Sequence, residues 1–243
     1  MKKLDRFHMM IVAQYFLFTQ DFVLLQMVCK KYEELLLMYH FNPISNASIF
    51  PNIETQHLYS LADKKLPHIM HFIYHYPITY TNYLKRIETI KKDQNEGKKV
   101  PQETYLKIAF CREDPFIQKG DVLYIPEGVT HIESVNIQMR TTKIVFPTTA
   151  KVICQRAFMY NYSNYVFNEG LLFIEKEAFL GNSLYNITLP KTLINVGSCA
   201  FKNCDSLTNI TILGKTHFTS CCFQGCKHLK QGDVDKIPRH AMN

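Results

Sequence analysis

The sequence lacks any apolar run of the roughly 18 residues that a membrane-spanning helix needs. Lys2 and Lys3 precede an apolar stretch, but Asp5 and Gln14 interrupt it and no small-residue cleavage site follows. This pattern predicts no signal peptide and no integral membrane segment, so we expect a cytoplasmic protein. The sequence also lacks a phosphate-binding glycine loop, a nucleophile elbow and an H-E-x-x-H helix. We therefore expect no enzyme, no catalytic residue and no cofactor.

The basic residues form no dense patch, although the formal net charge is +7 at pH 7. The richest stretch, residues 85–99, also carries Glu88, Asp93 and Glu96. Mixed charges of this kind are typical of solvated segments, and we interpret this one as a linker. The 47% hydrophobic content is that of an ordinary folded protein. We therefore expect no nucleic acid partner.

The C-terminal half repeats a small residue followed by phenylalanine. The phenylalanines are separated by 21, 22 and 22 residues, and the pairs are Ala157-Phe158, Ala178-Phe179, Ala200-Phe201 and Cys222-Phe223. Other columns keep this register: Pro147, Asn168 and Pro190, then Ile153, Ile174 and Val196, and finally Asn161, Asn182, Cys204 and Cys226. A period of this length predicts an array of stacked repeats, because one such unit cannot bury its own apolar face.

Each unit begins with a short β-prone segment, and the clearest are residues 144–146, 165–167, 187–189 and 210–212. A proline follows several of these strands and ends them, because it cannot donate to a ladder. The later columns are expected to turn the chain back over the strand and fill the core. Ile125-Pro126 starts a degenerate first unit, in which Asn136-Ile137 replaces the small residue and phenylalanine. Ala109-Phe110 is out of register and is not counted as a copy.

These columns resemble the BspA-like class of leucine-rich repeats, whose units run approximately L-x-x-I-x-I-P-x-x-V-x-x-I-G-x-x-A-F-x-x-C. The unit that fits best consists of Leu184, Ile187, Leu189, Pro190, Leu193, Val196, Gly197, Ala200, Phe201 and Cys204. The resemblance covers residues 121–230, about five repeats of which the first and last are atypical. Residues 231–243 are interpreted as a C-terminal tail.

The strand residues that alternate with the core positions are predicted to face outward. They form two columns, and the candidate partner-binding residues are Val122, Tyr124, Lys143, Val145, Asn164, Val166, Asn186, Thr188, Asn209 and Thr211. An asparagine ladder, one aromatic residue and small β-branched residues suit a protein or peptide partner better than an acidic polymer. The alternative is that both columns are only solvated sheet surface.

Two groups of residues have the types that ligate metals. Cys221, Cys222 and Cys226 lie close together, but Cys222 and Cys226 occupy small buried positions of the repeat. The histidines are spaced by three and four residues, as on one helix face, and they are His68, His71 and His75. Aromatic residues surround them and no acidic residue is adjacent. We therefore expect no metal site, and we expect reduced thiols in a cytoplasmic chain.

Residues 4–37 show a helical pattern of apolar residues, with a break and cap predicted at residues 19–21. One face is formed by Phe7, Ile11, Tyr15 and Phe18, and another by Phe22, Leu25, Cys29, Tyr32 and Leu36. The simplest interpretation is a helical cap over the open end of the repeat array. Residues 38–120 show no clear pattern.

The same segment resembles the F-box, whose pattern is roughly L-P, then I-L, Y-L, D-L and V-C-K-R-W. The residues that fit are Leu4, Tyr15, Phe16, Asp21, Phe22, Val28, Cys29, Lys30 and Lys31, with one extra residue between the helices. Asp5 and Tyr32 depart from the proline and tryptophan of the family. The resemblance implies binding to the Skp-type adaptor of cullin ubiquitin ligases, and the candidate adaptor-binding residues are Leu4, Ile11, Phe22, Val28 and Lys30.

Phe41-Asn42-Pro43 and Phe50-Pro51-Asn52, between such helices and such repeats, resemble a large protist family of leucine-rich repeat proteins. That family is usually described as surface-antigen-like. The sequence thus predicts an α+β fold: a helical N-terminal domain (residues 1–84), a linker and entry segment (85–120), and a short BspA-like leucine-rich-repeat solenoid. Two functions stay open: a cytoplasmic interaction protein of the F-box type, or an adhesin that reaches the cell surface without a signal peptide.

Overall fold

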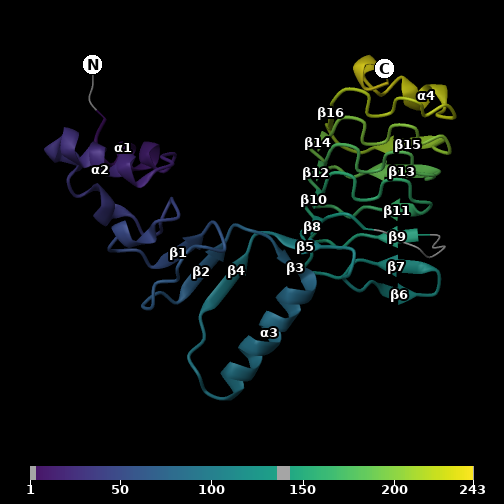
Figure 1. Cartoon of the computed structure of the whole chain (residues 1–243). Coiled ribbons are helices and arrows are strands. Elements are labelled where there is room, and N and C mark those ends of the chain that lie inside the picture. The colour runs from purple at the N-terminus through teal and green to yellow at the C-terminus, as the bar shows by residue number, and fades with distance from the viewer. Residues whose placement is uncertain (1–3, 136–142, 243) are drawn as a thin grey trace. The chain divides into compact units, whose positions relative to one another are not determined.

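The computed structural model describes residues 4–135 and 143–242 of the chain (Figure 1). The chain divides into unit 1, residues 1–78 and 84–107, and unit 2, residues 79–83 and 108–243. The division falls within helix α3 (Tyr80–Asn95), whose first residues belong to unit 2. The Asn136-Ile137 pair of the predicted first repeat lies outside the described residues.

Unit 1 begins with two helices and three short 3-10 helices: α1 (Arg6–Ala13), α2 (Thr19–Val28), η1 (Lys30–Tyr32), η2 (Leu35–Met38) and η3 (Ala47–Ile49). The carboxylate of Asp5 caps α1 by accepting a hydrogen bond from the backbone N–H of His8 at 2.9 Å. The break between the two helices lies at residues 14–18, earlier in the chain than the predicted break at residues 19–21. Thr19 already belongs to α2, and the Asp21 carboxylate accepts a hydrogen bond from the backbone N–H of Phe18.

Three aromatic rings form the centre of the unit 1 core. The ring centroid of Phe22 lies 6.0 Å from that of Tyr39 and 5.3 Å from that of Phe50, and all three side chains are buried. The predicted face that contains Phe22 does point into this core. The other predicted apolar face lies outside this core, because its four members are exposed: Phe7, Ile11, Tyr15 and Phe18.

The rest of unit 1 contains a parallel three-stranded sheet, in the order β1 (Thr55–Leu58), β2 (His71–Tyr74), β4 (Gln102–Tyr105). The structure therefore differs from the predicted helical domain at residues 1–84 and from the predicted linker at 85–120, which includes most of α3. Each strand has only four residues, and one inward position is the polar Gln56. Its amide bonds to the backbone of Lys64 and Leu66, which explains why the alternation was not visible in the sequence.

Unit 2 is a two-sided stack of short strands (Figure 1). One side is a seven-stranded sheet made of β16 (His217–Phe218), β14 (Asn195–Val196), β12 (Phe173–Ile174), β10 (Val152–Ile153), β8 (His131–Ile132), β5 (Ile108–Phe110) and β3 (Ile78–Thr79). The other side has a sheet in the order β11 (Asn164–Val166), β9 (Lys143–Val145), β7 (Val122–Tyr124), β6 (Ile117–Lys119), and a second one made of β13 (Asn186–Leu189) and β15 (Asn209–Ile212).

The four predicted strands are confirmed within one residue, but the seven-stranded sheet was not predicted. Its strands contain the column that was expected only to turn the chain back, so that Ile153 pairs with Ile132 on one side and Ile174 on the other. Ala109-Phe110 is indeed no copy of the small residue–phenylalanine pair, since Phe110 pairs with Ile132 instead. It nevertheless belongs to the array, because β5 extends this sheet.

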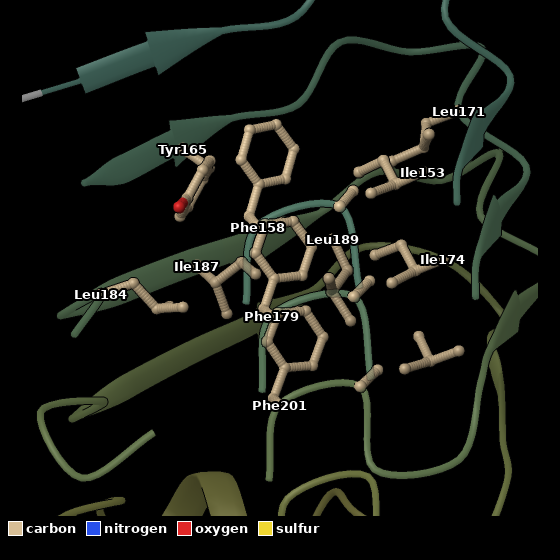
Figure 2. Packing of buried hydrophobic residues seen from close by; sticks show 14 of the residues in the cluster. Ile153, Phe158, Tyr165, Leu171, Ile174, Phe179, Leu184, Ile187, Leu189 and Phe201 are labelled. Carbon is tan, nitrogen blue, oxygen red and sulfur yellow. The ribbon is translucent and has the colours of Figure 1, made fainter. Parts of the chain in front are cut away.

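The repeated phenylalanines form one column through the core of unit 2. The rings of Phe158, Phe179, Phe201 and Phe223 are stacked, with successive centroids 5.4, 5.1 and 5.2 Å apart. Figure 2 shows three of these rings one above another, between the isoleucines of the seven-stranded sheet and the residues of the opposite strands. The last repeat, atypical in sequence, therefore continues the stack without interruption.

The predicted C-terminal tail closes the last turn of the array with two short helices, α4 (Gln231–Val234) and α5 (Arg239–Met242). Ile237 and Ala241 are buried in the core of unit 2. The carboxylate of Asp233 accepts a hydrogen bond from the backbone N–H of Ile210 at 3.1 Å. The backbone N–H of Phe223 donates to the carbonyl of Ala241 at 2.8 Å. The tail thus satisfies polar groups that a further repeat would otherwise bind.

Candidate protein-interaction surfaces

The first candidate surface is the outer side of β6, β7, β9, β11, β13 and β15, named here the repeat face. In these strands the middle residues Leu123, Ile144, Tyr165, Ile187 and Ile210 are buried. Their neighbours are half-buried or exposed, so the predicted strand register is correct. The ten predicted residues lie on this side: Val122, Tyr124, Lys143, Val145, Asn164, Val166, Asn186, Thr188, Asn209 and Thr211.

Strand pairing brings the predicted residues together in two rows. Val122, Lys143 and Asn164 are directly paired across β7, β9 and β11, and Tyr124, Val145 and Val166 form the parallel row. Asn186 pairs with Asn209, and Thr188 with Thr211. The asparagine ladder is real at this end, since the side-chain amide of Asn209 donates to the Asn186 side-chain oxygen at 2.5 Å.

Strand β6 was not predicted from the sequence, and it pairs with β7 in antiparallel orientation. This pairing adds Lys119 opposite Val122 and Ile117 opposite Tyr124. Both rows therefore extend by one residue. The turn between the two strands is Gly120-Asp121, and Gly120 adopts a positive φ of 62°. A two-residue turn with glycine between alternating residues is a hairpin pattern, so the sequence did contain the information needed.

A hollow of about 200 Å³ opens on the repeat face, and its lining includes Ile117, Lys119, Tyr124, Pro126, Glu127, Val145, Pro147 and Asn168. The ammonium of Lys119 lies 5.5 Å from the ring centroid of Tyr124. Asn168 stands where other repeats have proline, and its side-chain amide donates a hydrogen bond to the carbonyl of Phe146. The departure from the repeat pattern at Asn168 therefore lies at the edge of this hollow.

The second candidate surface is the exposed apolar side of α1 and α2, named here the α1–α2 surface. A hollow of about 500 Å³ lies on it, lined by Tyr15, Phe16, Leu17, Phe18, Asp21, Leu24, Leu25 and Val28. Of the predicted adaptor-binding residues, Leu4, Ile11, Val28 and Lys30 are exposed. The prediction that Phe22 binds an adaptor is wrong, because its side chain is 0% exposed and belongs to the core. Leu17, Leu24 and Met27 are also exposed, and the sequence pattern did not point to them.

The histidines considered as ligands are not on a helix. His71 lies in strand β2 and is exposed, whereas His75 follows that strand and contacts His57, with 3.0 Å between His75 Nε2 and His57 Nδ1. Burial and the nearby His75 lower the pKa of His57 to about 4. Among residues 4–135 and 143–242, there is no cluster of three or more potential metal ligands.

The cysteines of the last repeats are packing residues. Cys204, Cys222 and Cys226 are buried thiols without disulfide bonds. The Cys204 and Cys226 thiols each donate to a phenylalanine carbonyl of the preceding turn. Burial raises the pKa of the Cys222 thiol to about 11. Buried, hydrogen-bonded thiols of this kind act as small apolar residues.

None of the helices in the described parts of the chain is long and apolar enough to cross a membrane. No curated protein matches the chain. Among solved structures, the pneumococcal vaccine antigen PcpA is similar, with 22% identity and a TM-score of 0.38, over 48% of this chain and 31% of that chain. A leucine-rich repeat protein from Eubacterium ventriosum is similar with 17% identity and a TM-score of 0.40, over 74% of this chain and 59% of that chain.

This chain thus spans less than two thirds of the length of either protein. Residues 133–238 match the family described as "BspA type Leucine rich repeat region", in six copies. The comparison therefore counts six copies where the sequence columns suggested about five. Residues 133–238 are a BspA-type leucine-rich repeat region.

Proposed function

We propose that this protein is a non-enzymatic interaction protein that binds a protein or peptide through the repeat face. The observation that supports this most directly is the alignment of side chains in two rows, across β6, β7, β9 and β11 in one sheet and across β13 and β15 in the next. Repeat arrays use extended faces of this kind for binding, because a partner can contact many repeats at once. The hollow beside Tyr124 gives this face a concave site in addition.

The experiment compares partner capture by the full chain and by a variant of the repeat face. Asn186→Glu with Thr188→Glu should weaken capture, because it places two carboxylates on β13 within the face. The control is Lys215→Gln with Lys227→Gln, two exposed lysines of unit 2 whose replacement changes the net charge equally. Capture that survives the repeat-face change and is lost in the control would contradict the proposal.

The finer proposal is an F-box-type substrate adaptor, in which the α1–α2 surface binds a Skp-type adaptor and the repeat face holds the target. The F-box-like residue pattern supports it, and so does the exposure of Leu24, Met27 and Val28 along α2. An apolar patch of this kind marks an interaction site, since soluble proteins rarely leave one uncovered. This function would place the protein in the cytoplasm.

Co-purification with a Skp-type adaptor tests this proposal. Leu24→Lys should abolish the association, because it places a charge in the lined hollow of the α1–α2 surface. Leu61→Lys is the matched control: Leu61 is 87% exposed in unit 1 and does not line that hollow. No association of the unaltered chain, or equal loss in both variants, would contradict the adaptor function.

A surface adhesin is the alternative, and the match of residues 133–238 to BspA-type repeats supports it. In that case the repeat face would contact a partner outside the cell. Labelling of intact cells with a membrane-impermeant reagent decides between the two compartments. Labelled protein supports the adhesin, and complete protection from an external protease supports the cytoplasmic adaptor.

A further inference from the structure

The two halves of the repeat face differ in chemistry. The row Ile117, Tyr124, Val145 and Val166 is entirely apolar or aromatic across β6, β7, β9 and β11. On β13 and β15, in the second sheet, the corresponding repeat positions are Thr188 and Thr211. An apolar contact row with a hollow is therefore confined to the half that begins at β6. This half, on β6, β7 and β9, is named here the anchor half.

The neighbouring row places two positive charges beside the apolar row. Lys119, Val122 and Lys143 are directly paired across β6, β7 and β9, so the two lysines flank one valine in the strand register. Both lysines are exposed, and neither forms an ion pair with any residue that the structure describes. The corresponding row on β13 and β15 has the uncharged Asn186 and Asn209.

The acidic groups near the anchor half lie outside the two rows. Asp121 is in the turn between β6 and β7, beside the lysine row. Glu127 lines the hollow beyond the end of β7, and its carboxylate accepts hydrogen bonds from the backbone N–H and the hydroxyl of Thr148, both at 3.0 Å. Glu127 is therefore bound to a threonine of the next repeat, whereas the lysines remain available to a partner.

The volume of the hollow restricts its occupant. At about 200 Å³ it is smaller than the pockets that enclose whole small molecules, which begin at roughly 300 Å³. A hollow lined by a tyrosine ring, two prolines and aliphatic residues fits one apolar side chain of a larger partner. The lysine row is two residues away along the strand, a distance of about 7 Å in extended chain.

We propose that the anchor half binds an extended acidic and apolar peptide segment. A leucine, isoleucine or phenylalanine of the segment fills the hollow beside Tyr124, and an aspartate or glutamate two residues away faces Lys119 and Lys143. This inference rests on the proposed function of the repeat face and specifies its ligand. The lysines supply charge complementarity and orientation, and the hollow supplies desolvated apolar contact.

Selection of random heptapeptides by phage display against the full chain tests this proposal. We expect the enriched peptides to combine an aliphatic or aromatic residue with Asp or Glu two positions away. Lys119→Glu with Lys143→Glu should weaken their binding by about tenfold or more and, in a second selection, enrich basic peptides instead. Lys215→Glu with Lys227→Glu changes the net charge equally and should leave binding unchanged.

The outcomes separate this inference from the function on which it rests. Enriched peptides that depend on Asn186 and Thr188, but not on Lys119, Lys143 or Tyr124, would overturn the anchor half and keep the repeat face. Enriched basic peptides on the unaltered chain would also overturn it. Peptides that respond to no change on the repeat face, or no enrichment at all, would overturn both. Circular dichroism of each variant excludes unfolding as the cause.

Discussion

The rings of Phe179 and Phe201 lie face to face, with centroids 5.1 Å apart and an angle of 3° between their planes. Successive turns of the array are therefore in contact through identical side chains. The next ring in the column, Phe223, repeats the same geometry at 5.2 Å. Because Phe201 is stacked on both sides, its loss would interrupt the column in the middle.

Phe201→Ala should lower the free energy of unfolding of unit 2 by about 3–5 kcal/mol, as expected when a fully buried phenylalanine leaves a cavity. Phe173→Ala is the control, because Phe173 lies in the same unit but is 38% exposed. Urea denaturation followed by tyrosine fluorescence measures both, since the chain has 14 tyrosines and no tryptophan. Equal effects of the two changes would show that the column does not stabilise the array.

Gly197→Ala should destabilise unit 2 by about 1–3 kcal/mol, because the added methyl group would lie 2.6 Å from backbone atoms of Glu175 and Lys176. The backbones of two turns come too close there for any side chain. Gly232→Ala is the matched change, with no atom within 4 Å of the new Cβ. It should be neutral or slightly stabilising. Thermal unfolding of both variants measures the difference, and a neutral Gly197→Ala would contradict this packing.

Glu103→Gln should lower the stability of unit 1 by about 3 kcal/mol, the low end for a broken buried ion pair, because Arg86 and Lys65 stay partly solvated. The Glu103 side chain is 1% exposed and accepts hydrogen bonds from Arg86, Lys65, Tyr74 and Tyr105. Glu96→Gln removes an exposed ion pair with Lys98 and should cost less than about 1 kcal/mol. A similar cost for both would contradict a buried role for Glu103.

The same carboxylate gives unit 1 a defined acid dependence. Burial alone would raise the pKa of Glu103, but the hydrogen bonds from Arg86, Tyr105, Tyr74 and Lys65 outweigh it and lower the pKa from 4.5 to about 2. The unfolded chain therefore takes up this proton first as the pH falls. The stabilisation is full above the ordinary carboxyl pKa and is lost toward pH 2. The stability difference between the unaltered chain and Glu103→Gln should shrink over that range in urea titrations.

The repeat array could be predicted because the residues of each sequence column occupy the same structural position in every turn. Phe158, Phe179 and Phe201 must stack, so chain length between them is fixed and the spacing is visible in the sequence. The outward residues followed from strand alternation alone. The second sheet was missed because its strands are only two or three residues long, too short for any periodic pattern.

The fold of unit 1 was harder to predict from the sequence, because its stabilising contacts are individual and do not repeat along the chain. Buried polar residues such as Gln56 and the Glu103 side chain stand where an alternating strand would show apolar ones. In α1 and α2 the difficulty was the opposite one, because apolar residues there are exposed instead of buried. Their spacing marked two faces, and sequence periodicity cannot tell a core face from an exposed apolar surface. That distinction required the position of Phe22 relative to Tyr39 and Phe50.

Phe22 and Val28 lie on the same helix and give a direct test of this distinction. Val28 is 80% exposed at the C-terminal end of α2, so Val28→Lys should change stability by less than about 0.5 kcal/mol, and a cation is favourable at that helix end. Phe22→Ala should cost about 3–5 kcal/mol, because it empties the centre of the aromatic core. Urea denaturation of both variants measures the contrast. Strong destabilisation by Val28→Lys would mean that Val28 is packed inside the protein, and the α1–α2 surface would then be no docking site for a Skp-type adaptor.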